Sequence, residues 1–160
     1  MRLVAPFFAM LLAGPAAAQQ WTEYQSPDAA FTVHFPTDPY RTPDGRAFGA
    51  RVYSVAQENS VFTLTVADVP ETDNQVQEDA LMNEAVTRMT DGGAIKFDIP
   101  HRIRWFYGRQ LGVAGANGGY SYVAVFHHNN RLYQIEGKAF AAGGQAEADA
   151  MRFQQSLDFP

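Results

Sequence analysis

The sequence predicts an α+β fold, a single antiparallel β-sheet of six to seven strands flanked by two helices, in the order β-β-β-α-β-β-β-β-α. Seven short segments alternate apolar and polar residues with a period of two, whereas two longer segments repeat their apolar residues at helical spacing. The strands follow one another without the regular strand–helix alternation of parallel sheets. This order favours antiparallel pairing, with the helices packed on the sheet.

Three strands are expected before the first helix. Residues 30–35 place three large apolar side chains on one face and polar side chains on the other. A turn with Pro and Gly follows at residues 42–45. Residues 46–55 and 60–67 are the next two strands, and the short polar link between them predicts an antiparallel hairpin.

A change of period predicts an amphipathic helix over residues 74–90, with acidic residues in its early turns and two glycines after its end. Strands are expected again at 95–99, 103–113, 120–127 and 131–139, with Gly- and Asn-rich hairpin turns after the second and third of them. A last helix is expected over residues 145–156. No repeat or interdomain linker divides the segments.

The N-terminus has the pattern of a secretory signal peptide. Arg2 provides the positive charge, residues 3–12 are almost entirely apolar, and Ala16, Ala17 and Ala18 form a small-residue cleavage site. The apolar run is shorter than the roughly 20 residues that span a bilayer. We therefore expect residues 1–18 to be removed and residues 19–160 to form one α+β domain, periplasmic or secreted. The alternative is a buried N-terminal helix.

The composition indicates a fold held together by its apolar core. The chain has no Cys, so it cannot use disulfides, but it has 12 Phe, 7 Tyr and 2 Trp as large apolar anchors. The absence of Cys also leaves no residue for lipid attachment after the cleavage site. The formal net charge of −5 argues against a nucleic-acid partner and against an anionic membrane surface.

Two stretches together carry a resemblance to a known family. Residues 24–27 (YQSP) with 31–36 (FTVHFP), and residues 131–137 (RLYQIEG) with 153–157 (FQQSL), resemble the opening and closing segments of the PsbP/Mog1/DcrB-like small exported bacterial domains. The resemblance covers nearly the whole mature chain in element order. It implies an antiparallel sheet flanked by helices and an accessory or binding role. It implies no shared catalytic residues.

No motif for catalysis or for a cofactor stands out. His127 and His128 are neighbours on a strand, so they point to opposite faces and cannot bind one metal; they are expected to be exposed beside the turn at Asn129 and Asn130. The glycines between 112 and 119 precede a strand, whereas a phosphate-binding loop needs a helix N-terminus. We expect no catalytic residue, no metal and no cofactor.

The segment 101–109 departs from the acidic background, because it combines three arginines, a histidine and three adjacent aromatic residues. Arginine and aromatic residues dominate binding hot spots. We therefore predict a recognition face formed by Arg102, Arg104, Trp105, Tyr107 and Arg109. Two alternatives stay open. The aromatic residues could be core and Arg109 an internal ion pair, or a bulge at Gly108 could turn Arg109 outward.

These observations predict an exported, non-catalytic binding or accessory domain of the bacterial envelope. Its partner is an unknown envelope protein or small ligand, with no nucleic acid and no membrane insertion after signal cleavage. The alternative is a periplasmic hydrolase or another enzyme whose site forms only in three dimensions.

Overall fold

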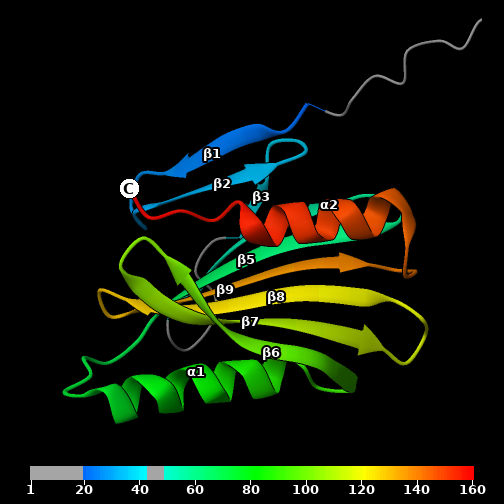
Figure 1. Cartoon of the computed structure of the whole chain (residues 1–160). Coiled ribbons are helices and arrows are strands. Elements are labelled where there is room, and N and C mark those ends of the chain that lie inside the picture. The colour runs from blue at the N-terminus through cyan, green and yellow to red at the C-terminus, as the bar shows by residue number, and fades with distance from the viewer. Residues whose placement is uncertain (1–19, 43–48) are drawn as a thin grey trace, which may run out of the picture.

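The computed structural model describes residues 20–42 and 49–160. The predicted signal peptide lies outside the described residues, as does most of the turn predicted at 42–45. The elements, labelled in Figure 1, are β1 (Thr22–Ser26), β2 (Phe31–Phe35), β3 (Tyr40–Thr42), β4 (Arg51–Ala56), β5 (Ser60–Asp68), α1 (Gln75–Met89), β6 (Gly93–Ile103), β7 (Phe106–Gly115), β8 (Tyr120–His128), β9 (Arg131–Ala139) and α2 (Gly144–Gln155).

A seven-stranded antiparallel sheet forms the centre of the fold, in the order β3-β4-β5-β9-β8-β7-β6. The last four strands form a meander, and β9 returns to pair with β5. The structure confirms the predicted α+β class and element order, and adds the short strands β1 and β3. Strand β2, the segment predicted at 30–35, pairs with β1 in a separate two-stranded sheet.

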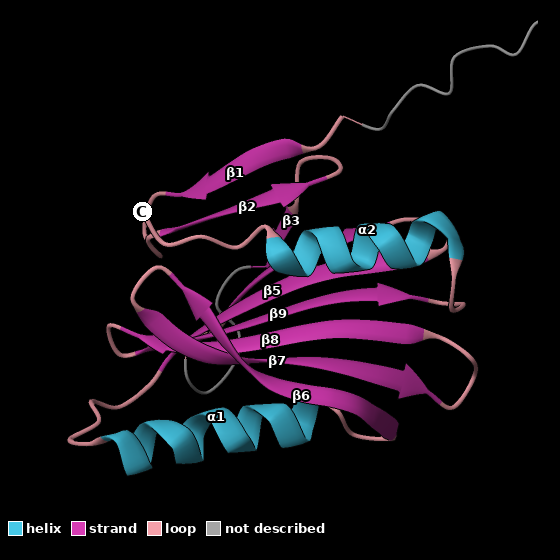
Figure 2. Ribbon diagram, in the orientation of Figure 1, coloured by secondary structure: helices cyan, strands magenta, loops and turns pink. Residues whose placement is uncertain are grey.

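The two helices cover opposite faces of the large sheet. Helix α1 lies on one face, and α2 together with the β1–β2 sheet lies on the other (Figure 2). Apolar side chains on the central strands point alternately to the two faces of the sheet, and they form a hydrophobic core on each face. Phe62, Phe126 and Phe153 belong to the cluster on the α2 side, whereas Met82 and Val125 belong to the cluster under α1. Strand β8 is therefore apolar on both faces.

The predicted first helix is confirmed, and its start has a physical cause. The Asn74 side chain accepts a hydrogen bond from the Gln77 backbone N–H at 3.2 Å, which satisfies one of the free donors of the first turn. Buried Met82, Ala85 and Val86 face the sheet. The helix packs mainly against β8, so within residues 20–42 and 49–160 no helix covers the same face of the sheet over β4 and β5.

The strand predicted over 103–113 is wrong at its beginning. Strand β6 continues to Ile103, and the chain then turns back within two residues, because Arg104 has a φ of 53° in the left-handed region. Ile103 pairs with Phe106 across this tight hairpin. Pro100 lies within β6, which is possible because β6 is an edge strand.

Gly108 makes no bulge. It pairs with His101 on β6 and with Phe126 on β8, and it is buried. A Cβ at this position would overlap the Val125 carbonyl oxygen and the Phe126 ring, so the glycine allows close packing. The register shift in this hairpin lies instead between Ile95 and Phe97. The bulge predicted to turn Arg109 outward is therefore absent from Gly108.

Candidate functional site

The tip of the β6–β7 hairpin exposes two aromatic side chains around one arginine. Trp105 is 78% exposed and Tyr107 is 65% exposed, so the alternative that they belong to the core is wrong. The Arg102 guanidinium carbon lies 5.5 Å from the centre of the Trp105 ring and 5.1 Å from that of Tyr107. Arg102 pairs with Tyr107 across the hairpin, which places both side chains on one face. We call these three residues the hairpin tip.

The other two arginines of the predicted face are bound within the chain. Arg104 donates two hydrogen bonds to the Asp158 carboxylate, at 3.0 and 2.7 Å, and this guanidinium lowers the pKa of Asp158. Arg109 forms an ion pair with Asp98 and donates to the Asn83 side chain on α1. The structure therefore brings Arg102, Trp105 and Tyr107 together and places Arg109 in an internal ion pair.

A groove of about 640 Å³ separates the hairpin from α2. Its lining includes His34 of β2, His101, Arg102 and Ile103 of β6, and Met151 and Arg152 of α2. We call it the arginine groove. Arg152 stacks on Trp21, with its guanidinium carbon 4.6 Å from the ring centre, and the His34 Nε2 atom lies 3.6 Å from the Glu23 carboxylate. The sequence analysis missed His34 and Arg152, because no pattern along the chain connects them with Arg102.

On the opposite face of the sheet, a pocket of about 370 Å³ lies between the hairpin tip and the first turns of α1. His127 lines it with a side chain only 7% exposed, which corrects the prediction of an exposed turn histidine. Its Nδ1 atom lies 3.5 Å from the Glu78 carboxylate, whereas its buried Nε2 atom has no hydrogen-bond partner among the described residues. Trp105 and Tyr107 line the same pocket, so the hairpin tip borders a hollow on each face.

His128 points to the other face, as the strand alternation predicts. Its ring lies 3.8 Å from the Phe106 ring, centre to centre, and also contacts Phe159. Burial, reinforced by the neighbouring His127 and Arg131, lowers the pKa of His128. The described part of the chain has no group of three or more His, Cys, Asp or Glu side chains placed to hold a metal ion.

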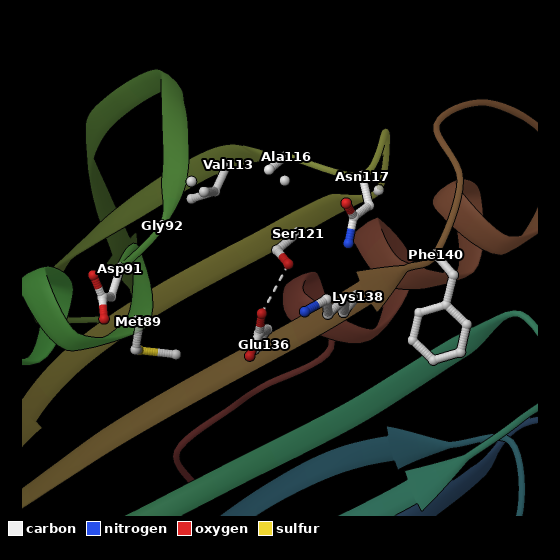
Figure 3. Close-up of a pocket in the computed structure, with 13 residues that line it drawn as sticks. Met89, Asp91, Gly92, Val113, Ala116, Asn117, Ser121, Glu136, Lys138 and Phe140 are labelled. Carbon is white, nitrogen blue, oxygen red and sulfur yellow. Dashed lines mark hydrogen bonds between the residues drawn. The ribbon is translucent and has the colours of Figure 1, made fainter.

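A third hollow, of about 530 Å³, lies at the other end of α1 (Figure 3). Its walls are the end of α1 and the β7–β8 turn, which is the hairpin turn predicted from the glycines. Ser121 donates to the Glu136 carboxylate at 2.8 Å on its floor, and Lys138 follows on β9. These polar residues alternate on neighbouring strands, a pattern that is also typical of any solvated sheet face. Sequence reasoning therefore did not single them out.

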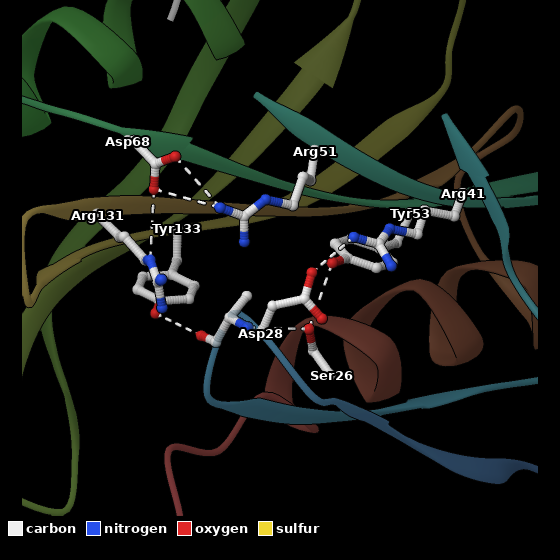
Figure 4. Close-up of polar contacts among 9 residues, drawn as sticks. Ser26, Asp28, Arg41, Arg51, Tyr53, Asp68, Arg131 and Tyr133 are labelled. Carbon is white, nitrogen blue, oxygen red and sulfur yellow. Dashed lines mark hydrogen bonds and ion pairs between the residues drawn. The ribbon is translucent and has the colours of Figure 1, made fainter. Parts of the chain in front are cut away.

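A polar network connects the β1–β2 sheet to the large sheet (Figure 4). The Tyr133 hydroxyl donates to the Ala29 carbonyl oxygen at 2.7 Å, and Arg41 forms an ion pair with Asp28 at 2.8 Å. Nearby, the Asp68 carboxylate binds both Arg51 and Arg131. The Tyr133 and Arg41 contacts therefore explain how the two sheets are held together, whereas the Asp68 ion pairs join strands within the large sheet.

The similarity of this chain to a solved structure is one of fold. No family model matches the chain, and no curated protein matches it. The fold is similar to the solution structure of cyanobacterial PsbP (CyanoP) from Synechocystis sp. PCC 6803, with a TM-score of 0.61 and 10% identity over 92% of this chain and 96% of that chain. A crystal structure from Bacteroides thetaiotaomicron matches with a TM-score of 0.42 and 13% identity, over 89% of this chain and 49% of that one.

The structure also bears on the membrane. No helix within residues 20–42 and 49–160 is long and apolar enough to cross a bilayer.

The resemblance predicted from the two terminal stretches is confirmed at the level of the fold, because the match to cyanobacterial PsbP spans nearly the whole of both chains. The chain has a PsbP-like fold.

Proposed function

We propose that this chain is an exported, non-catalytic binding domain of the bacterial envelope that recognises a partner protein through its hairpin tip. The signal-peptide pattern of residues 1–18 supports export. The PsbP-like fold supports an accessory role, since the resemblance implies no shared catalytic residues. The expected partner is an envelope protein, because the signal-peptide pattern directs the chain out of the cytoplasm. The net charge of −5 argues against a nucleic acid.

One observation carries the proposal. Two large aromatic side chains, Trp105 and Tyr107, are mostly exposed and flank Arg102, which has no carboxylate partner within the described residues. Exposing large aromatic rings to water forgoes the free energy of burying them, so burial in the free protein does not explain this arrangement. Tryptophan, tyrosine and arginine are the residues that most often dominate the binding energy of an interface.

The alternative function, an enzyme, has weaker support. The nearest feature to a catalytic pair is His127 beside Glu78, in the pocket under α1. Catalysis by a histidine-activated hydroxyl needs a Ser or Thr within hydrogen-bond reach of the imidazole. Within the described residues no such hydroxyl is hydrogen-bonded to His127.

The experiment that tests the proposal compares two exposed aromatic residues. Immobilised mature protein is incubated with a detergent-solubilised envelope extract of the producing bacterium, and captured proteins are identified by mass spectrometry. Trp105→Ala should abolish capture of a specific protein without lowering the melting temperature, since the ring is 78% exposed. Tyr40→Ala is the matched control, because Tyr40 is 68% exposed on the remote edge strand β3. Equal capture by both variants would contradict a role for the tip.

A further inference from the structure

The pocket between the hairpin tip and the first turns of α1 has negative charge on its walls. Glu71 and Glu78 line it, whereas none of the lysines and arginines in the described part of the chain does. Glu71 is exposed and, within residues 20–42 and 49–160, has no ion-pair or hydrogen-bond partner. The surrounding stretch, residues 71–79, carries four carboxylates and no Lys or Arg. We call this hollow the acidic pocket.

The strand register places the walls of the acidic pocket on one face of the sheet. Arg109 of β7 pairs with Val125 of β8, and both side chains contact or pack under α1. Two positions further along each strand, toward the hairpin tip, Tyr107 and His127 point to the same face by strand alternation. Glu78 reaches this face from α1, with its carboxylate 3.5 Å from the His127 Nδ1 atom.

His127 is the feature that an acidic helix start does not explain. Acidic residues in the first turns of a helix offset its dipole, which accounts for Glu78 but not for a buried imidazole beside it. The carboxylate beside Nδ1 favours the proton on that nitrogen, which leaves Nε2 as an acceptor. This acceptor has no partner within the described residues, and the side chain is only 7% exposed. A buried acceptor without a partner lowers stability unless a bound molecule supplies a donor.

The rim and the size of the acidic pocket indicate what such a donor belongs to. Trp105 and Tyr107 line it with mostly exposed rings, and Arg102, which contacts both rings, is not among its lining residues. The volume of about 370 Å³ is at the lower end of the range of about 300–1,000 Å³ for ligand pockets, so it suits a side chain and not a folded segment. Lysine and arginine combine an apolar stem with a charged end that carries several N–H donors.

From this arrangement we infer that the acidic pocket binds a lysine or arginine side chain of the partner protein. Its charged end lies at the Glu71 and Glu78 carboxylates, beside His127. Its aliphatic stem packs against Trp105 and Tyr107. The inference rests on the proposed function, because both rings belong to the hairpin tip. Charge complementarity selects the occupant, since the carboxylates attract a cation and repel an acidic segment.

The probe is a fluorescein-labelled peptide of sequence GGRLRGG, with GGQLQGG as its uncharged counterpart, and binding to the mature protein is measured by fluorescence anisotropy. The basic peptide should bind, and its affinity should fall as salt is raised. Glu78→Gln should weaken binding about tenfold, the effect of losing one charge-assisted contact. Glu84→Gln is the matched control, because Glu84 is an exposed glutamate on α1 that does not line the pocket. It should leave binding unchanged.

NMR spectra of the histidine ring nitrogens, recorded in the same titration, locate the peptide. The His127 signals should move, whereas those of His34, on β2 at the opposite face of the sheet, should stay in place. Several results would overturn the inference: no binding of GGRLRGG, equal binding of GGQLQGG, equal affinity of the Glu78→Gln and Glu84→Gln variants, or movement of the His34 signals in place of the His127 signals. Equal affinity for the free diamine putrescine would assign the pocket to a small amine and would overturn it as well.

Glu78→Gln could lower the melting temperature, because Glu78 lies against His127. Glu71→Gln then tests the same pocket, since the Glu71 side chain is exposed and makes no contact that holds the fold. It should weaken binding about threefold, the effect of one exposed ion pair, and an unchanged affinity would contradict the inference.

The two hypotheses fail separately. Glu78 is not part of the hairpin tip, so an unchanged peptide affinity in Glu78→Gln, together with loss of partner capture in Trp105→Ala, refutes the pocket and keeps the tip. Weaker peptide binding in Glu78→Gln, with normal capture by Trp105→Ala, supports the pocket and refutes the tip.

Discussion

Replacement of Arg109 by alanine removes an ion pair that joins β7, β6 and α1. Arg109 binds Asp98 on the neighbouring strand and Asn83 on the helix. Exposed ion pairs contribute about 0.2–1 kcal/mol, whereas removing one partner of a fully buried pair costs about 3–5 kcal/mol. The Arg109 and Asp98 side chains are 28% and 29% exposed, so we expect an intermediate loss of about 2 kcal/mol.

Urea unfolding followed by tryptophan fluorescence measures this change. Arg88→Ala is the control, since Arg88 pairs with Glu84 on the surface of α1, with side chains 55% and 67% exposed, and should lose only about 0.3–0.5 kcal/mol. In a double-mutant cycle with Asp98→Ala, the coupling between Arg109 and Asp98 should be about 1 kcal/mol. If Arg109→Ala unfolds at the same urea concentration as Arg88→Ala, the ion pair does not stabilise the fold, and Arg109 returns to the candidates for the recognition face.

Three further predictions concern the fold. Gly137→Ala should destabilise the protein by about 3 kcal/mol in urea unfolding, because a Cβ there would overlap the backbone of Ala150 in α2. Gly115→Ala should be close to neutral, because a Cβ there would make only ordinary van der Waals contact with Gly119. Burial lowers the pKa of His128, because the folded protein disfavours the charged imidazole. The neutral His128 side chain therefore contributes fully to stability above about pH 6.5, and this contribution is lost as the pH falls below that value. His128→Phe should therefore reduce the fall in melting temperature between pH 7 and pH 5. An unchanged fall would show that His128 does not cause the pH dependence of stability. Tyr133→Phe should cost about 1–2 kcal/mol in urea unfolding, because the buried carbonyl oxygen of the β1–β2 turn loses its donor; no loss would mean that water replaces the hydroxyl.

The sequence by itself determined the α+β class, the order of the elements and the likeness to the PsbP group. These features follow from conformational preferences and side-chain periodicity within short stretches of the sequence. A strand that is half-buried must alternate, a helix on a sheet must repeat its apolar residues every three to four positions, and Gly and Asn permit tight turns. The helix at 75–89, with its Asn74 cap, and the turn at Asn129 and Asn130 were predictable for this reason.

The tertiary structure alone decided which residues meet. The turn at Arg104 and Trp105 has no Gly, Asn or Pro, so the alternation continued through it and predicted one long strand. Trp105 therefore lies in the turn between β6 and β7, and not inside the strand predicted over 103–113. The choice of Asp98 as the partner of Arg109, and of the aromatic rings as supports for Arg102 and Arg152, depends on contacts between distant segments. A periodic pattern reports which face of an element is buried, but it carries no information about which side chain of another element lies opposite.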